Sequence, residues 1–313
     1  MAATHRGRIG TAIALILISM FLLSGTDASV KAVSADFPLW QIYVARSVFA
    51  VPILIGLSAR SGIAQAARII QPWIALRSVL LTSMWIAYYT ALPHMDLSIA
   101  ATALYTTPLF IAALSAVWGS EPVSRRTLLG IGFGFAGVLV ILRPTGSDFS
   151  FWTLLPVLGA LFYAGAAVLT RARCAEENPV VLALSLHCCL LAAGVLGGLV
   201  AVLEPLDTSD PFLFGRWEAM EGTDWLLMIG LGCVMVLVAL GVGRAYQSAP
   251  PAIVGTFDYA YLVFAAVWGL TFFGERLDAL ALTGMGLILA AGVLVVSRSE
   301  RWKGMAATSP PRS

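Results

Sequence analysis

The chain has 313 residues, of which 59% are hydrophobic and 12% are charged. The charged share is about half that of a soluble domain, so the composition indicates an integral membrane protein. A net charge of +2 is too small to indicate binding to nucleic acid. The four cysteines form no CxxC motif and no spacing with histidine that suits zinc, so we expect no metal and no cofactor.

Ten apolar runs, most of them close to the roughly 20 residues that cross a bilayer core, follow one another along the chain. The runs are too long for strands and lack an alternation of period two. The predicted fold class is therefore all-α, an integral membrane protein with ten transmembrane helices. These helices are expected at residues 9–33, 38–58, 72–93, 97–118, 127–143, 150–170, 179–203, 223–243, 251–273 and 279–297.

Arginine and lysine residues in the connecting segments predict the orientation. With the N-terminus in the cytoplasm, thirteen of these residues lie inside, and only Arg143, Arg216 and Arg276 lie clearly outside. We therefore expect a multi-pass protein of a bacterial inner membrane with both termini in the cytoplasm. A cleaved secretory signal is the alternative for the first run, because Val33–Ser34–Ala35 resembles a cleavage site.

The sequence repeats itself. When it is shifted by 154, residues 91–110 align with residues 245–264, and the match continues without a gap over some fifty residues. Equivalent pairs are Tyr105 with Tyr259, Glu121 with Glu275 and, at a shift of 140, Lys31 with Arg171. The last pair gives the first run a partner in the second half, so we expect it to be retained as a helix.

Five spans in each half mean that the second copy enters the membrane upside down. We therefore expect a first five-helix repeat over residues 1–145, an inverted second repeat over residues 146–300 and a cytoplasmic tail over residues 301–313. Such an inverted pair can exchange the conformations of its halves, which allows alternating access. The pattern favours a transporter over a membrane-embedded enzyme or an accessory subunit.

Several motifs resemble the EamA family of the drug/metabolite transporter superfamily. They are WIAYYTAL from Trp85, TPLF at Pro108, GSE at Glu121 and FGE at Glu275. The resemblance implies ten helices, a central cavity open to one side at a time and movement of small metabolites without ATP. Members of the family move amino acids, nucleotide-like cofactors and vitamins such as riboflavin.

Charged residues within the apolar runs are candidates for the site. Asp27 and Lys31 lie four apart on one helix face, where they form either a self-neutralising pair or a gate. Arg46 lies deep in the second span, so we expect it to face the interior as half of an ion pair or as a substrate anchor.

Asp258 is the only Asp, Glu, Lys or Arg between Ala245 and Gly274. Its repeat equivalent is Leu104, so the fold itself does not require a carboxylate there. It is predicted to bind a coupling proton or a cation; the alternative is an ion pair with Arg46 or Lys31.

Aromatic residues supply the remaining candidates. Trp85, Tyr88 and Tyr89 share one helix face and are expected to line a cavity. Tyr105, Tyr259 and Tyr261 complete the predicted substrate-binding set. No HExxH motif or nucleophile elbow occurs in the spans, so no residue is predicted to be catalytic.

The predicted function is that of a secondary active transporter for a small organic metabolite, either a vitamin such as riboflavin, an amino acid or a related compound. The expected partners are this substrate and the lipid bilayer. Coupling to a proton or a counter-substrate is expected, and a homodimer is an open option.

Overall fold

The computed structural model describes residues 2–59, 67–117, 129, 132, 133, 136, 137, 139, 140, 151–203, 210–248, 257, 259–276, 278–287 and 290. Every regular element that it describes is helical. The α-helices are α1 (Ala2–Ala32), α2 (Leu39–Ala59), α4 (Pro72–Ala91), α5 (Leu97–Leu104), α6 (Thr107–Val117), α8 (Leu154–Arg173), α9 (Pro179–Leu203), α10 (Pro211–Phe214), α11 (Gly222–Ser248) and α13 (Ala260–Phe273). Short 3-10 helices are η1 (Ala67–Ile70), η2 (Leu92–His94) and η3 (Phe151–Thr153).

The helices fall where the apolar runs predict them. Five are long and apolar enough to cross a membrane, over Gly10–Ala32, Leu39–Ala59, Phe151–Thr170, Pro179–Leu203 and Gly222–Ala245. The chain is therefore an all-α membrane protein, as predicted. The last predicted span is helical over residues 279–287 and at residue 290, and the few described residues within 127–143 are helical too. The rest of both spans lies outside the described residues.

The fourth predicted span forms two helices rather than one. α5 ends at Leu104, and α6 begins at Thr107 with Pro108 as its second residue. Proline has no N–H to donate to the Leu104 carbonyl, so a continuous helix would lose this hydrogen bond. The Thr107 hydroxyl donates to that carbonyl instead, at 2.7 Å. The expectation of one helix over 97–118 was wrong because proline at this point favours a new first turn.

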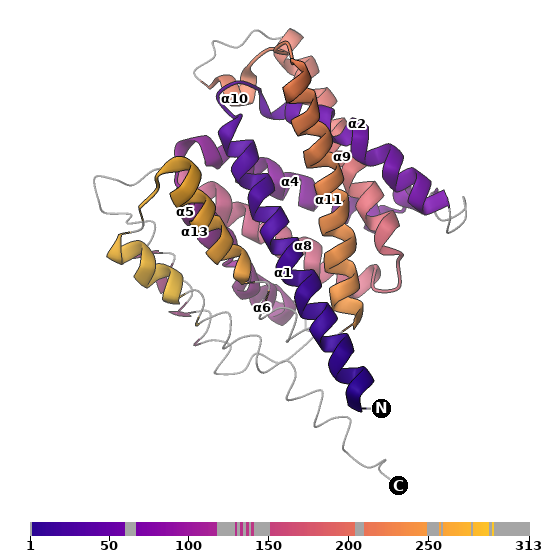
Figure 1. The fold of residues 1–313 in the computed structure, drawn as a ribbon, viewed down its shortest axis with the longest axis vertical. Helices are drawn as coiled ribbons and strands as arrows, with labels where there is room; N and C mark the ends of the chain where they lie inside the picture. The colour runs from indigo at the N-terminus through magenta and orange to yellow at the C-terminus, as the bar shows by residue number, and fades with distance from the viewer. Residues whose placement is uncertain are drawn as a thin grey trace.

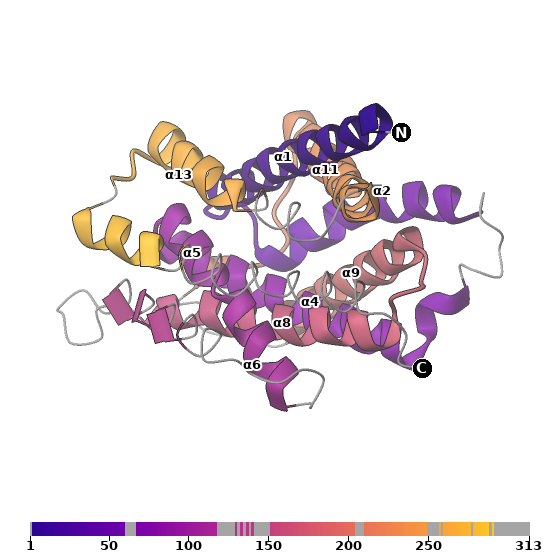
Figure 2. The same ribbon diagram turned by 90° about the horizontal axis from the view of Figure 1, so that it is seen from below.

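The helices form two layers that meet along α2 and α9. α1, α11 and α13 lie in one layer, and α4, α6 and α8 lie in the other (Figures 1 and 2). Within the layers α1 packs on α11 and α13, and α8 packs on α4 and α6. α2 packs on α9 and α11, α4 packs on α9, and α5 packs on α13. The layers are therefore joined chiefly through α2 with α9 and through α5 with α13.

Small residues allow α2 and α9 to approach closely. A Cβ atom at Gly198 would lie 2.8 Å from the Trp40 ring, and one at Gly194 would lie 2.8 Å from the Trp40 carbonyl oxygen. Gly194 and Gly198 are four apart on α9, the spacing at which two membrane helices pack backbone to backbone. Any larger residue at either position would force the helices apart.

The outer surface is apolar, whereas several charged and polar groups are buried. Leu196 and Val202 on α9 and Leu226 on α11 are each more than 60% exposed. Asp27 and Arg46, by contrast, are 1% and 0% exposed. A lipid environment accounts for the exposed apolar residues, and the buried charges need partners inside the protein.

Candidate functional site

A buried carboxylate stands where three helices meet. Asp27 lies on α1, and its Oδ1 accepts a hydrogen bond from the Tyr89 hydroxyl of α4 at 2.9 Å. Its Oδ2 accepts from the Tyr261 hydroxyl of α13. Both oxygens of Asp27 are therefore held by tyrosines from opposite halves of the sequence.

The hydrogen bonds around Asp27 run in one direction. Tyr261 has a single hydroxyl hydrogen and gives it to Asp27, so Tyr88 must be the donor in the 2.9 Å bond between the two tyrosine hydroxyls. On the other side, Arg46 Nη1 donates to the Tyr89 hydroxyl at 3.3 Å. Two chains of donors thus converge on Asp27, an arrangement that suits its ionised form.

Arg46, on α2, is buried among aromatic rings. Its guanidinium carbon lies 4.8 Å from the centroid of the Tyr43 ring and 5.5 Å from that of Tyr89. Such cation–π contacts replace part of the hydration that the charge loses on burial. Among the described residues, neither Nε nor Nη2 of Arg46 has a hydrogen-bond partner.

The predicted aromatic residues gather around Asp27. The Trp85 and Tyr89 rings are 5.0 Å apart, and Tyr105 stacks on Tyr261 at 5.3 Å. Tyr105 also lies 5.5 Å from Tyr259, its repeat equivalent. We call the following residues the tyrosine cluster: Asp27, Arg46, Trp85, Tyr88, Tyr89, Tyr105, Tyr259 and Tyr261. The structure thus brings together every predicted substrate-binding residue except Asp258, which lies outside the described residues.

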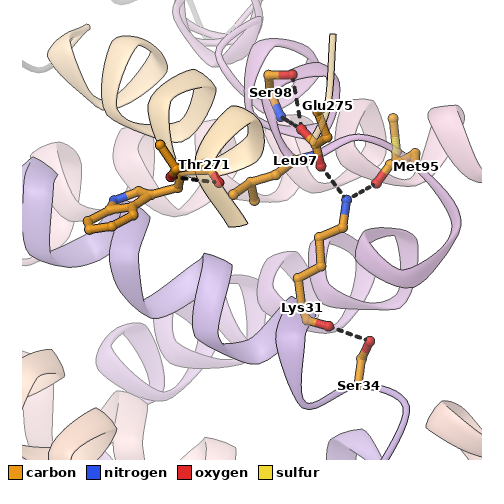
Figure 3. A network of polar contacts seen from close by, with 8 residues as sticks. Lys31, Ser34, Met95, Leu97, Ser98, Thr271 and Glu275 are labelled. Carbon is orange, nitrogen blue, oxygen red and sulfur yellow. Dashed lines mark hydrogen bonds and ion pairs between the residues drawn. The ribbon is translucent and has the colours of Figure 1, made fainter. Parts of the chain in front are cut away.

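Lys31 belongs to a second polar network, one helical turn along α1 from Asp27 (Figure 3). Its Nζ lies 2.5 Å from Glu275 Oε1 and donates to the Met95 carbonyl oxygen at 2.7 Å. Lys31 therefore pairs with Glu275 rather than with Asp27, so the alternative of a self-neutralising pair on α1 was wrong. The spacing of four suggested that pair, but each side chain finds a nearer partner on another helix.

Glu275 also binds the beginning of α5. Its Oε1 accepts from the Leu97 backbone N–H at 2.8 Å, and its Oε2 accepts from the Ser98 hydroxyl at 3.4 Å. A carboxylate at this position is stabilised by the positive end of the helix dipole. One residue earlier, Gly274 ends α13 with φ of +64°, a left-handed conformation that glycine adopts readily. This turn helps bring Glu275 to its partners.

A second carboxyl lies beside this network. Burial raises the pKa of Asp96, Glu275 raises it further, and Lys31 acts in the opposite direction. Lys31 therefore offsets the negative charge of two carboxyl groups at this end of the molecule.

Glu275 and Tyr43 are site residues that the sequence did not identify. Glu275 had a signal, because it is the repeat equivalent of Glu121 and closes the FGE motif. Its partner, however, lies 244 residues away. Tyr43 stands three residues before Arg46 and therefore on the same face of α2, but an apolar span with one tyrosine gives no reason to single it out.

Comparison with known proteins relates the chain to a transporter family. Residues 10–143 match the model of the EamA-like transporter family. The match covers most of the first predicted repeat, including the part of the tyrosine cluster that α1, α2 and α4 contribute.

Similar proteins extend the match to nearly the whole chain. A pseudopaline exporter of Pseudomonas aeruginosa is 26% identical over 92% of this chain and 96% of its own length. A riboflavin transporter of Vibrio cholerae is 25% identical over 81% of each chain. A crystal structure with 19% identity and a TM-score of 0.60, covering 93% of this chain and 98% of its own, has the same fold. The chain is thus similar to transporters over most of its length.

Proposed function

We propose that this protein is an EamA-type secondary active transporter that moves a small organic metabolite across a bacterial inner membrane by alternating access. Vitamins such as riboflavin, amino acids and related compounds are the candidate cargo. The names of the relatives support transport, because they include an exporter and riboflavin transporters.

The observation that carries this proposal is the burial of Asp27 and Arg46 in membrane-spanning helices. A charge at the centre of a membrane helix costs about 2.5–3.5 kcal/mol on insertion scales. A protein that needed only stability would use apolar residues here, since well-packed apolar replacements of buried ion pairs are often as stable. Charges kept at such a position are typical of a path for a polar substrate or an ion.

The packing of the helices supports the proposed inverted repeat. In the proposed repeat, each helix of the first half has an equivalent in the second half: α1 corresponds to α8, α2 to α9, α4 to α11, and α5 together with α6 to α13. The pairing of α1 with α11 then becomes that of α8 with α4, and α1 with α13 becomes α8 with α6. The pairs α2–α9 and α5–α13 map onto themselves. Tyr105 and Tyr259, which are repeat equivalents, meet across the last of these pairs.

We assign the Lys31–Glu275 network as the closure of one end of the path. It joins the end of α1 to the beginning of α5 and to the segment after α13. These three points belong to loops that the distribution of basic residues predicts to face outward. With both termini in the cytoplasm, the network would then close the outer end.

We assign coupling to the tyrosine cluster or to Asp258, which precedes Tyr259 in the sequence. Asp258 keeps its predicted role in binding a proton or a cation. A homodimer would bury part of the outer surface and is not needed for this mechanism.

Transport into liposomes that contain only this protein tests the proposal. Radiolabelled riboflavin and radiolabelled amino acids would be offered in turn, with a pH gradient or an internal pool of the same compound. We expect accumulation of at least one compound by the wild type and none by Asp27→Asn. Chemical conversion without accumulation, or no movement of any compound, would refute transport.

A further inference from the structure

Two nitrogens of the buried Arg46 have no hydrogen-bond partner among the described residues. They indicate which chemical group the substrate carries. Resting on the proposed transport function, we propose that Arg46 binds a carboxylate group of the substrate. The substrate class is therefore that of organic acids and amino acids rather than neutral vitamins.

The two unpartnered nitrogens of Arg46 lie on the same edge of the guanidinium. Nη1 is used by Tyr89, whereas Nε and Nη2 have no partner among the described residues. The N–H bonds of Nε and Nη2 are parallel, and they match the spacing of the two oxygens of a carboxylate. This is one of the two edges with which arginine forms a bidentate pair.

Other buried polar groups near Arg46 also lack a partner. The Tyr43 ring lies 4.8 Å from the Arg46 guanidinium carbon, and the Tyr43 and Ser47 hydroxyls of α2 are buried without a partner among the described residues. His187 on α9 is 2% exposed, and its Nδ1 likewise has no partner in the described part of the chain. A buried polar group left unpaired costs about 1–3 kcal/mol. The unpaired nitrogens of Arg46 and the unpaired hydroxyls beside it therefore indicate an acceptor that comes from outside these residues.

Arg77 is a second arginine inside an apolar helix, on α4. Its Nε donates to the Thr170 hydroxyl at 2.8 Å, whereas its Nη1 has no partner among the described residues. The edge formed by Nε and Nη2 is therefore open in Arg46 and engaged in Arg77. Arg46 and Arg77 form a matched pair for experiment.

The charges of the site favour a single carboxylate over a phosphate. Arg46 is the only cation of the tyrosine cluster within the described residues, and Lys31 is engaged by Glu275. A phosphate group, with its greater charge, would need a second cation. The Tyr89 hydroxyl accepts a hydrogen bond from Arg46 and donates one to Asp27. An anion bound to Arg46 would therefore change the electrostatic environment of Asp27 through this one hydroxyl.

Binding by matched ligands tests the proposal without any mutation. The purified protein in detergent would be heated with each standard amino acid and several simple organic acids, each compared with its own amide, and with riboflavin, which has no carboxylate. We expect at least one acid to raise the unfolding temperature and its amide to need about ten- to a hundredfold more ligand for the same rise. Arg46→Gln should abolish the preference for the acid, whereas Arg77→Gln should retain it.

Three results would overturn the proposal: equal stabilisation by acid and amide, stabilisation by riboflavin alone, or no stabilisation by any acid. The first is also the result expected if Asp258 fills the free edge of Arg46. The proposed function fails separately. An acid that binds but does not cross a liposome membrane would refute transport and leave the carboxylate site intact. Transport of riboflavin alone would support transport and refute the carboxylate site.

Discussion

Lys31 and Glu275 lie 244 residues apart in the sequence and 2.5 Å apart in space. Their side chains are only 13% and 5% exposed, so each charge depends on the other. We expect Lys31→Met to leave Glu275 without its cation and to lower the free energy of unfolding by about 3–5 kcal/mol. Thermal unfolding of the detergent-solubilised protein measures this loss.

The exposed pair of Arg68 and Glu177 is the control for that substitution. It has a similar distance, 2.7 Å, and its side chains are 47% and 10% exposed, against 13% and 5% in the Lys31–Glu275 pair. Arg68→Met should therefore cost less than Lys31→Met, about 1 kcal/mol. Equal losses of unfolding free energy in Lys31→Met and Arg68→Met would show that the buried Lys31–Glu275 network stabilises the fold no more than the Arg68–Glu177 pair does.

Asp27→Asn tests the charge at the centre of the tyrosine cluster. The amide keeps the shape of the side chain but presents an NH₂ group to one of two tyrosine hydroxyls that donate to Asp27. It also leaves Arg46 without a nearby negative charge. We expect the protein to reach the membrane but to lose transport in liposomes by about a hundredfold or more.

Ser24→Ala, one turn earlier on α1, is the matched control. It removes a neutral hydroxyl that accepts from Trp268 at 3.1 Å. Transport in this variant should stay within about threefold of the wild type. If Asp27→Asn transports as well as Ser24→Ala, Asp27 has no role in the path.

Two tyrosine substitutions test the direction of the hydrogen bonds. Tyr261→Phe removes the donor to Asp27 and the acceptor of Tyr88, whereas Tyr88→Phe removes only one bond. A bond to a charged group contributes about 1.5–3 kcal/mol and a neutral one about 1 kcal/mol. Tyr261→Phe should therefore lower the unfolding temperature more than Tyr88→Phe. The opposite order would show that the donors do not converge on Asp27.

The close approach of α2 and α9 depends on Gly198. Gly198→Leu places a side chain where the Trp40 ring lies 2.8 Å from a Cβ atom, so we expect the yield of folded protein from the membrane to fall severalfold. Gly230→Ala on α11 is the control, because no described atom lies within 4 Å of the added carbon. Its yield should match that of the wild type. Equal yields from both variants would argue against tight packing at Trp40.

The positions of most helices could be predicted from the sequence because a bilayer requires long apolar runs. The break between α5 and α6 could not be seen in the same way. Residues 97–118 contain no charged residue. The effect of Pro108 depends on whether Thr107 can satisfy the Leu104 carbonyl, which only the structure shows.

The candidate site was predictable in part for a similar reason. A charge in an apolar run must be buried and paired, which singles out Arg46. Asp27 was predicted only to pair with Lys31 or to form a gate. The partners of these charges could not be predicted, because Tyr89 and Tyr261 are 62 and 234 residues from Asp27. Sequence spacing reveals neighbours on one helix but not contacts between distant helices.

The accessibility of two buried serines tests alternating access most directly. The Ser98 hydroxyl donates a hydrogen bond to Glu275. Ser78 lies near the beginning of α4 and is hydrogen-bonded to Ser185 at 2.9 Å. Each would be changed to cysteine in turn, in a protein whose four native cysteines are replaced by alanine, and labelled with a water-soluble maleimide. The account predicts that Lys31→Met speeds labelling at position 98 and slows it at position 78. Faster labelling at both positions, or no change at either, would contradict it.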